Sequence, residues 1–187
     1  PYTYPGEVRL LANGTAPQPI FLRGATGQKP LFKAKLALNP VSYLIVENLA
    51  VDRDMQSSAV NIWSDVNGVD HHVAFRHCDV TDSSSGILIS GKAGYPTQDI
   101  VVYDCIVHDQ GQWDPALAAG DRDYLGIYSG DFTERVWIVD NETYHNEGNG
   151  IGEPIDRKFV FRATCREHGH EWDHHGGVVF LAKDRAL

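Results

Sequence analysis

The sequence predicts an all-β protein, a right-handed parallel β-helix: a solenoid of about five to six coils. Three observations predict this fold. First, one phrase recurs five times: an alternating apolar strand followed by a small polar residue, a turn, then a second short apolar strand, preceded in most copies by glycine. Second, the first strands begin 30, 27, 36 and 23 residues apart, a spacing typical of solenoids. Third, each strand has one apolar face that a single coil cannot bury.

The first strand of each phrase sets the register of the stack. These strands are expected at Tyr43–Asn48, Val73–Cys78, Ile100–Cys105, Val136–Asn141 and Phe159–Thr164. Because side chains alternate between the faces of a strand, the first, third and sixth residues of each should point inward. The coils should then stack about 4.8 Å apart, with like residues over like residues.

The second strand of each phrase is shorter. These strands are expected at Val60–Trp63, Gly86–Ile89, Gly126–Ser129, Gly150–Glu153 and Gly177–Phe180. The Ile or Val after each glycine should point inward and extend the same core.

Small polar and thiol side chains are expected to form one inward file where the chain bends after each first strand. The file consists of Asn48, Cys78, Cys105, Asn141 and Thr164. Such side chains can bond to the backbone and to one another, which satisfies buried polar groups. Cys78 and Cys105 should stack in adjacent coils, and we expect reduced thiols, with a disulfide as the alternative.

Composition indicates a single soluble domain over residues 1–187. The chain has 187 residues, 42% of them apolar, and 18 glycines, which is enough for one core. No apolar run approaches 18 residues, so we expect no membrane span. The net charge of −9 argues against a nucleic-acid partner. It would also repel an acidic polysaccharide unless bound cations or a basic cluster bridge the two.

The repeats resemble those of a known family. Val136-Trp-Ile-Val-Asp-Asn-Glu-Thr-Tyr-His-Asn146 and Ile100-Val-Val-Tyr-Asp-Cys-Ile-Val-His-Asp109 are similar to repeats of the pectate-lyase-like superfamily of right-handed parallel β-helix proteins. The likeness covers roughly residues 16–182. It implies a carbohydrate-active protein, secreted or located at the cell surface or in the periplasm, with acidic polysaccharide as partner. In that family the polysaccharide lies along the sheet of second strands.

The largest departure from the repeat is an insertion at residues 108–124, and loops of this kind flank the family's binding groove. The resemblance implies a polysaccharide lyase that acts by β-elimination, which needs a base and a group that neutralises the uronate carboxylate. We assign Lys92 as the base, Arg122 as the carboxylate partner and Tyr128 as proton donor or sugar platform. The expected substrate-binding residues are Trp113, Asp114 and Asp131. Asp121 and Asp123 are the expected ligands of a Ca²⁺ cofactor.

Two other functions remain open. A glycoside hydrolase of the same fold would use clustered aspartates, for which Asp121, Asp123 and Asp131 are candidates. The sequence lacks the Asp-Asp pair and the Gly-His-Gly motif expected of that group. A non-catalytic adhesin or tail-spike-like scaffold would need only exposed aromatic side chains for carbohydrate binding. Its candidates are Trp63, Trp113, Tyr128, Trp137 and Trp172.

Two features lie near the C-terminal end. Residues 168–175 contain four histidines and an aspartate, and we expect a solvated turn there, with a transition-metal site as the alternative. The extra Trp172 breaks the ligand spacing of metallo-β-lactamase-type hydrolases. Neither end of the chain shows an amphipathic capping helix, so we expect a neighbouring domain or chain to cover the open strand edges.

Overall fold

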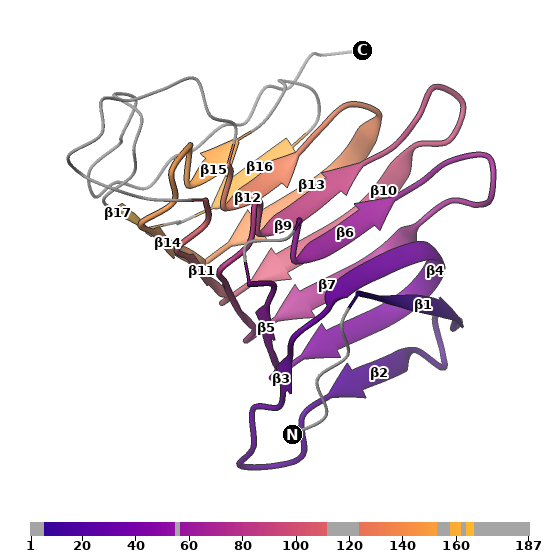
Figure 1. Ribbon diagram of the computed structural model, residues 1–187. Helices are drawn as coiled ribbons and strands as arrows, with labels where there is room; N and C mark the ends of the chain where they lie inside the picture. The colour runs from indigo at the N-terminus through magenta and orange to yellow at the C-terminus, as the bar shows by residue number, and fades with distance from the viewer. Residues whose placement is uncertain (1–5, 55–56, 112–123, 153–157, 162–163, 167–187) are drawn as a thin grey trace.

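A computed structural model describes residues 6–54, 57–111, 124–152, 158–161 and 164–166. Within these residues the chain is all-β and without helix, and its parallel strands stack as a solenoid of about five turns. The turns follow one another along the stack from the N-terminal to the C-terminal end (Figure 1). The predicted β-helix architecture is therefore confirmed.

Each turn contributes a strand to each of three faces, which we name after the order of strands in the repeat. The first-strand face contains β2 (Ile20–Arg23), the second half of β4 (Lys35–Glu47), β7 (His71–Arg76), β10 (Thr97–Tyr103), β13 (Thr133–Val139) and β16 (Lys158–Phe161). The second-strand face contains β1 (Glu7–Asn13), the first half of β4, β6 (Val60–Trp63), β9 (Ile87–Ser90), β12 (Ile127–Ser129) and β15 (Ile151–Gly152). Because β4 runs through both, these two faces form one continuous hydrogen-bonded sheet.

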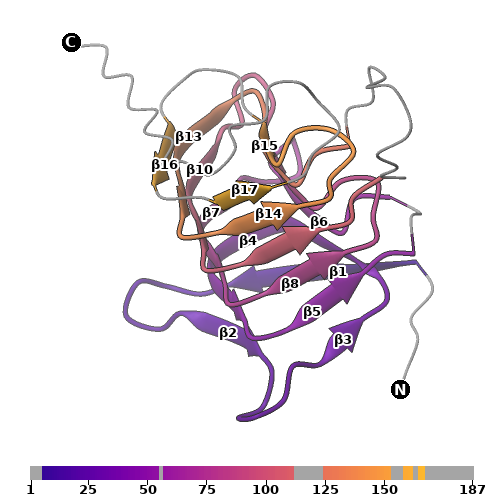
Figure 2. The ribbon, with the colours of Figure 1, turned by 90° about the vertical axis from the view of Figure 1, so that its left-hand side faces the viewer.

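The third-strand face is a separate six-stranded sheet, seen as a ladder in Figure 2. It contains β3 (Leu31–Phe32), β5 (Ala50–Asp52), β8 (Asp79–Thr81), β11 (Ile106–His108), β14 (Glu142–Tyr144) and β17 (Thr164–Arg166). All of its strand pairs are parallel.

The predicted inward residues of the three middle first strands form the core. Each of them is at most 2% exposed: Val73, Phe75, Cys78, Ile100, Val102, Cys105, Val136, Ile138 and Asn141. The register also agrees, since Ile100 pairs with Val73 on one side and with Val136 on the other. Here strict alternation between apolar and polar residues is enough to place the strands.

The predicted register is wrong by one residue in the earliest of the five first strands. Leu44, rather than Tyr43, pairs with Val73, and the fully buried Leu49 continues the inward file of Cys78. Asn48 instead has a left-handed φ of 54° at the bend. Asparagine tolerates this conformation better than most residues, so a polar residue here marks the bend and not the core.

The last predicted first strand is also wrong by one residue, but in the opposite direction. Phe159 pairs with Trp137 rather than with Val136. Thr164 pairs with Glu142 in β17, so it belongs to the third-strand face and not to the file that contains Asn141. The inward file at this bend therefore consists of Leu49, Cys78, Cys105 and Asn141 among the residues whose side chains are described.

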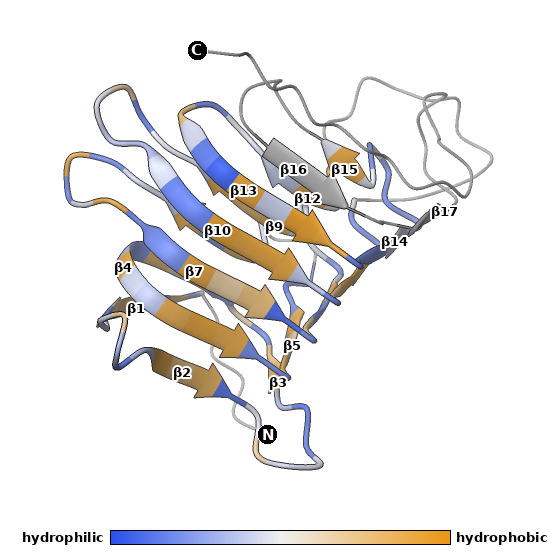
Figure 3. Cartoon of the chain, turned by 180° about the vertical axis from the view of Figure 1, so that it is seen from behind, coloured by the Kyte–Doolittle hydropathy of each residue, from blue (hydrophilic) through white to orange (hydrophobic). Residues whose placement is uncertain are grey.

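Left-handed residues recur at equivalent places in successive turns. The bend after the first strands has Asn48, His77, Asp104 and Asp140; the start of the first strands has Tyr43, His72, Asp99 and Arg135; and the end of the third strands has Asp82, Asp109 and His145. Each such residue interrupts the alternation of side chains. Figure 3 shows the consequence on the first-strand face, where β7, β10 and β13 are polar in their first part and apolar in their second.

The recurring glycines before the second strands have a packing role. A Cβ on Gly86 would lie 2.4 Å from the carbonyl oxygen of Gly126, and one on Gly126 would lie 2.5 Å from that of Gly150. Both distances are far below van der Waals contact. Glycine is thus required at this corner because the backbones of adjacent turns approach closely.

The buried thiols of Cys78 and Cys105 do not form a disulfide. Cys78 and Cys105 are free and 1% exposed, and the hydrogen bond with Cys78, together with burial, raises the pKa of Cys105. They therefore pack as small apolar groups, as a reduced pair is expected to do. The part of the chain that the structure describes has no helix with the length and apolarity needed to cross a lipid bilayer.

Candidate functional site

The second-strand face carries an aromatic residue, Tyr128, in space left free by glycines. Tyr128 points outward between the buried Ile127 and Ser129. A Cβ on Gly130 would lie 2.8 Å from Cε1 of its ring, and one on Gly152 would lie 3.3 Å from Cδ2. Because neither neighbour has a side chain, the ring can lie along the sheet surface. A flat aromatic ring in this setting is a possible platform for a sugar ring.

Lys92, the predicted base, lies in a short turn between β9 and β10. The backbones of Lys92 and Tyr95 form an antiparallel bridge, and the intervening Gly94 has a φ of +81°. Lys92 is exposed. Hydrogen bonds from the backbone of Asn67 and, to a smaller extent, the charge of Lys92 lower the pKa of Asp65. Lys92 thus lies near a carboxylate of the preceding turn.

The structure brings Asp131 close to Lys92 along the backbone but places Tyr128 farther away. The carbonyl of Asp131 accepts a hydrogen bond of 3.0 Å from the amide of Gly91. Tyr128 pairs with Leu88, four residues before Lys92, which corresponds to about 13 Å along the strand.

The other predicted site residues belong to the insertion. Trp113, Asp114, Asp121, Arg122 and Asp123 lie outside the described residues. The two described ends of the insertion, Gly111 and Tyr124, lie next to the adjacent residues Glu147 and Gly148. A Cβ on Gly111 would lie 2.5 Å from Oε2 of Glu147, and the amide of Gly148 donates to the carbonyl of Tyr124. The insertion therefore starts and ends at the corner between the third-strand and second-strand faces.

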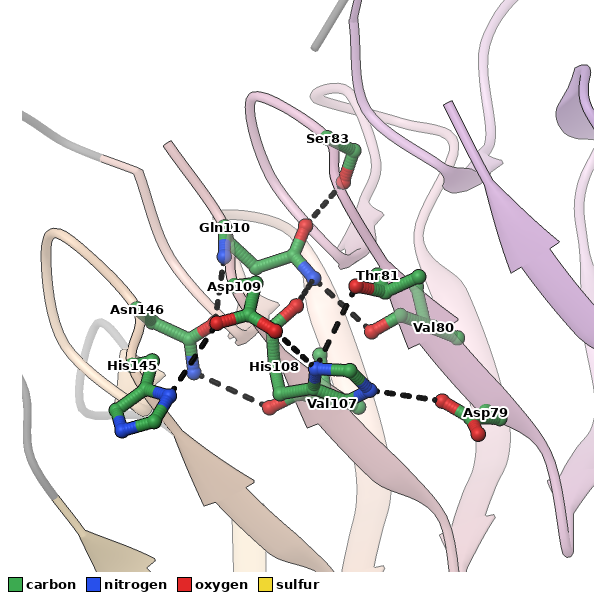
Figure 4. Close-up of polar contacts among 10 residues, drawn as sticks. All are labelled: Asp79, Val80, Thr81, Ser83, Val107, His108, Asp109, Gln110, His145 and Asn146. Carbon is green, nitrogen blue, oxygen red and sulfur yellow. Dashed lines mark hydrogen bonds and ion pairs between the residues drawn. The ribbon is translucent and has the colours of Figure 1, made fainter. Parts of the chain in front are cut away.

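At this corner four ionisable residues from three successive turns form what we call the insertion-base cluster: Asp79, His108, Asp109 and His145 (Figure 4). Nε2 of His108 is 3.1 Å from Oδ1 of Asp79, and its Nδ1 is 2.6 Å from Oδ2 of Asp109. Nδ1 of His145 is 3.3 Å from Oδ1 of Asp109. The ring of Tyr144 stacks on His108 at 4.7 Å.

The cluster favours a positively charged His108. Burial opposes this charge, but hydrogen bonds with Asp79 and Asp109 outweigh it and raise the pKa of the imidazole. The hydrogen bond with His108 correspondingly lowers the pKa of Asp79. Burial and the charges of Asp52 and Asp109 raise the pKa of nearby Asp82. Perturbed ionisable groups that gather in one place are typical of functional sites and of structural ion-pair networks alike.

A buried amide network holds the inner side of the cluster. Nε2 of Gln110 donates to the carbonyls of Val80 and His108, and its Oε1 accepts from the hydroxyl of Ser83 (Figure 4). The backbone amide of Gln110 donates a hydrogen bond of 3.1 Å to Oδ1 of Asn146. This network fixes the backbone on both sides of Asp109, so the carboxylate has a defined position.

Comparisons of the chain with protein-family models, curated proteins and solved structures return no match. The function must therefore be argued from the site itself.

Sequence reasoning missed the insertion-base cluster. It assigned residue 108 to the insertion, whereas His108 is the last residue of β11 and pairs with Tyr144. His145 occupies the left-handed position equivalent to Asp109. The available signal was the dipeptide His-Asp at 108–109, at the start of the insertion.

The described residues contain no group of three or more His, Cys, Asp and Glu side chains placed to hold a metal ion. The predicted Ca²⁺ ligands Asp121 and Asp123 and the histidine-rich segment 168–175 lie outside these residues. Within the described part, carboxylates and imidazoles of the cluster pair with one another instead.

Proposed function

We propose that this chain is a carbohydrate-active β-solenoid that binds an acidic polysaccharide along its second-strand face. The observation that carries the proposal is Tyr128, whose ring lies beside Gly130 and Gly152 on the outer side of the sheet. The resemblance of the repeats to the pectate-lyase-like superfamily supports the same face. The insertion, which begins and ends at the edge of this face, would supply further contacts.

A second aromatic residue lies on the same face. Tyr128 pairs with Leu88, which pairs with Asn61, and Trp63 lies two residues farther along β6. Two strand spacings across the sheet and two residues along it separate the Cα atoms of Trp63 and Tyr128 by roughly 12 Å. Two platforms at this separation suit an extended chain of sugar rings better than a single monosaccharide.

The reaction that we propose for this face is β-elimination. Lys92 would remove the proton beside the uronate carboxylate, Arg122 would neutralise that carboxylate, and Tyr128 would donate a proton or hold the sugar. The net charge of −9 opposes an anionic substrate, so a cation such as Ca²⁺ would assist binding. Asp121 and Asp123 are its proposed ligands, and Trp113, Asp114 and Asp131 the proposed sugar contacts.

Binding and elimination are tested separately. Affinity electrophoresis in gels that contain pectate, alginate or chondroitin measures binding, and the ultraviolet absorbance of unsaturated products measures elimination. Tyr128→Ala should weaken binding, whereas Tyr103→Ala should not. Tyr103 is the matched control because it is a 38% exposed tyrosine on the first-strand face. Equal retardation of both variants and the unaltered protein would count against the second-strand face.

The second candidate is a non-catalytic carbohydrate-binding protein. It is favoured by the position of Lys92, which is exposed in a short turn. Lys92 lies about 13 Å along the strand from Leu88, the residue opposite Tyr128, which is a long separation for two groups that act on one sugar linkage. Binding that is sensitive to Tyr128→Ala, without product from any uronate polymer, would select this alternative. Product formation that Lys92→Ala abolishes would select the lyase.

A further inference from the structure

Two adjacent histidines at the start of β7 lie on the same side of the sheet. Neighbouring side chains of a strand normally point to opposite faces. His72, however, has a left-handed φ of 54°, which interrupts the alternation directly after His71. As a result Nδ1 of His71 lies 2.9 Å from Nδ1 of His72. The two rings are nearly perpendicular, with centroids 5.1 Å apart.

Tyr43, from the preceding turn, holds both imidazoles in place. Its ring stacks on His72 with a centroid distance of 4.4 Å and an angle of 21°. It meets the ring of His71 edge-on at 5.6 Å. The side chain of His72 is still 45% exposed, so the pair is accessible from solvent.

We propose that His71 and His72 together bind a divalent ion of the zinc type through their Nδ1 atoms. Imidazole nitrogen suits Zn²⁺, Cu²⁺ and Ni²⁺. Two nitrogens at 2.0–2.1 Å from one tetrahedral Zn²⁺ are roughly 3.3 Å apart. The pair at 2.9 Å therefore needs to open by a few tenths of an ångström, and each ring must turn so that its Nδ1 lone pair points at the ion instead of at the other nitrogen. Water completes the coordination, since two protein ligands leave positions free.

Binding requires no change in the charge of the rings. Without an ion, one Nδ1 donates a hydrogen bond to the other. On binding, the proton of the donor ring moves to its Nε2, so that both rings remain neutral and both Nδ1 lone pairs face the ion.

A carboxylate lies next to the pair and is held by an arginine. Oδ2 of Asp99 is 3.8 Å from Nδ1 of His72. Arg135 holds this carboxylate with two hydrogen bonds, of 2.6 Å to Oδ1 and 2.9 Å to Oδ2. Asp99 is therefore positioned to accept a hydrogen bond from a water molecule on the ion, an arrangement that commonly supports metal sites.

The test is isothermal titration of the full chain with ZnCl₂. His72→Asn removes the ring but keeps a residue that tolerates the left-handed conformation. His77→Asn is the matched control, because His77 also has a φ of 54° and lies 2.8 Å from a carboxylate, that of Asp104. The expected result is one Zn²⁺ fewer per chain in His72→Asn and unchanged stoichiometry in His77→Asn. Equal stoichiometry in the two variants overturns the proposal.

Histidines of segment 168–175 are present in both variants and cancel in that comparison. A second measurement locates the ion directly: nuclear magnetic resonance of protein with ¹⁵N-labelled histidine. Addition of ZnCl₂ should shift the Nδ1 signals of His71 and His72, which single substitutions assign. Shifts confined to other histidines overturn the proposal. Circular dichroism of each variant confirms that a lost signal does not come from unfolding.

Discussion

The two carboxylate oxygens of Asp109 contact different histidines. Oδ2 is 2.6 Å from Nδ1 of His108, and Oδ1 is 3.3 Å from Nδ1 of His145. His108 in turn reaches Asp79 of the preceding turn. Through these two histidines, one carboxylate connects three successive turns of the solenoid at the start of the insertion.

Asp109→Asn should destabilise the protein most strongly at acidic to neutral pH. Asparagine accepts the left-handed φ of 54° at this position, so the change removes charge without backbone strain. The expected loss is about 1 kcal/mol, since the carboxylate is partly exposed and its ion pairs are screened. Urea unfolding of both proteins measures the difference.

The pH dependence follows from His108, whose folded-state pKa is raised above the unfolded value of about 6.5. Its contribution is fully present below that value and is lost as pH rises through the folded-state pKa. The stability difference between the unaltered protein and Asp109→Asn should therefore be larger at pH 6 than at pH 9. Asp104→Asn is the control, because Asp104 is also left-handed and pairs with a single exposed histidine. An equal pH profile for both variants would refute the role of the cluster.

The sequence was sufficient for the stacking of the turns but not for every register. Alternation placed Val73, Ile100 and Val136 correctly, because a shift by one residue would expose a whole apolar face. It misplaced Asn48, which was aligned with the inward Asn141 but lies at the left-handed bend position, one residue before the inward Leu49. Asparagine suits both a position in the inward file and a left-handed bend, so residue type alone could not distinguish the two positions.

The candidate site was predictable only in part. The second-strand face followed from the repeat, and Tyr128 points outward on it as the alternation requires. The contact of His108 with Asp79 was not predictable, because it joins residues about 30 positions apart whose registers differ by two. The proximity of His71 and His72 likewise depends on one positive φ, a conformation that histidine adopts more often than most residues but that its presence alone does not establish.

Asn141→Ala should be among the most destabilising single substitutions. Oδ1 of Asn141 accepts a hydrogen bond of 2.9 Å from the amide of Cys105, and its Nδ2 donates to the carbonyls of Val102 and Val139. Loss of this buried side chain leaves those groups unpaired, at a cost of about 2–4 kcal/mol. Asn149→Ala, at an exposed position, should change stability by less than about 0.5 kcal/mol. Thermal and urea unfolding measure both changes in stability. A small effect at Asn141 would contradict the stabilising role of its buried hydrogen bonds.

Gly130→Ala tests the aromatic platform without removing it. The new Cβ would lie 2.8 Å from Cε1 of Tyr128, so the ring must move from the sheet surface. Under the proposed function, polysaccharide binding should weaken about three- to tenfold while the protein remains folded. Ser90→Ala removes a neighbouring hydroxyl without adding an atom and should bind normally. Affinity electrophoresis compares the two, and unimpaired binding by Gly130→Ala would mean that the sugar does not contact this ring.

Asp70 connects the stability of the fold to pH from inside the core. Its side chain is 0% exposed. Oδ1 accepts a hydrogen bond of 2.8 Å from the backbone amide of Val41, but Oδ2 has no hydrogen-bond partner among the residues that the structure describes. Burial raises the pKa of this carboxyl to about 7. The folded protein therefore holds a proton that the unfolded chain, with a pKa near 3.9, has already released at neutral pH.

The sign of the effect is opposite to that of most aspartates. Between about pH 4 and pH 7 the folded state binds more protons, so stability falls as pH rises, by on the order of 3–4 kcal/mol in total. Asp70→Asn keeps the acceptor for Val41 and cannot ionise, so it should be more stable than the unaltered protein at pH 8 and similar at pH 4. Urea unfolding across this range measures the difference. Parallel curves would show that Asp70 ionises in the folded protein as it does in water, because only a raised pKa makes the two proteins diverge.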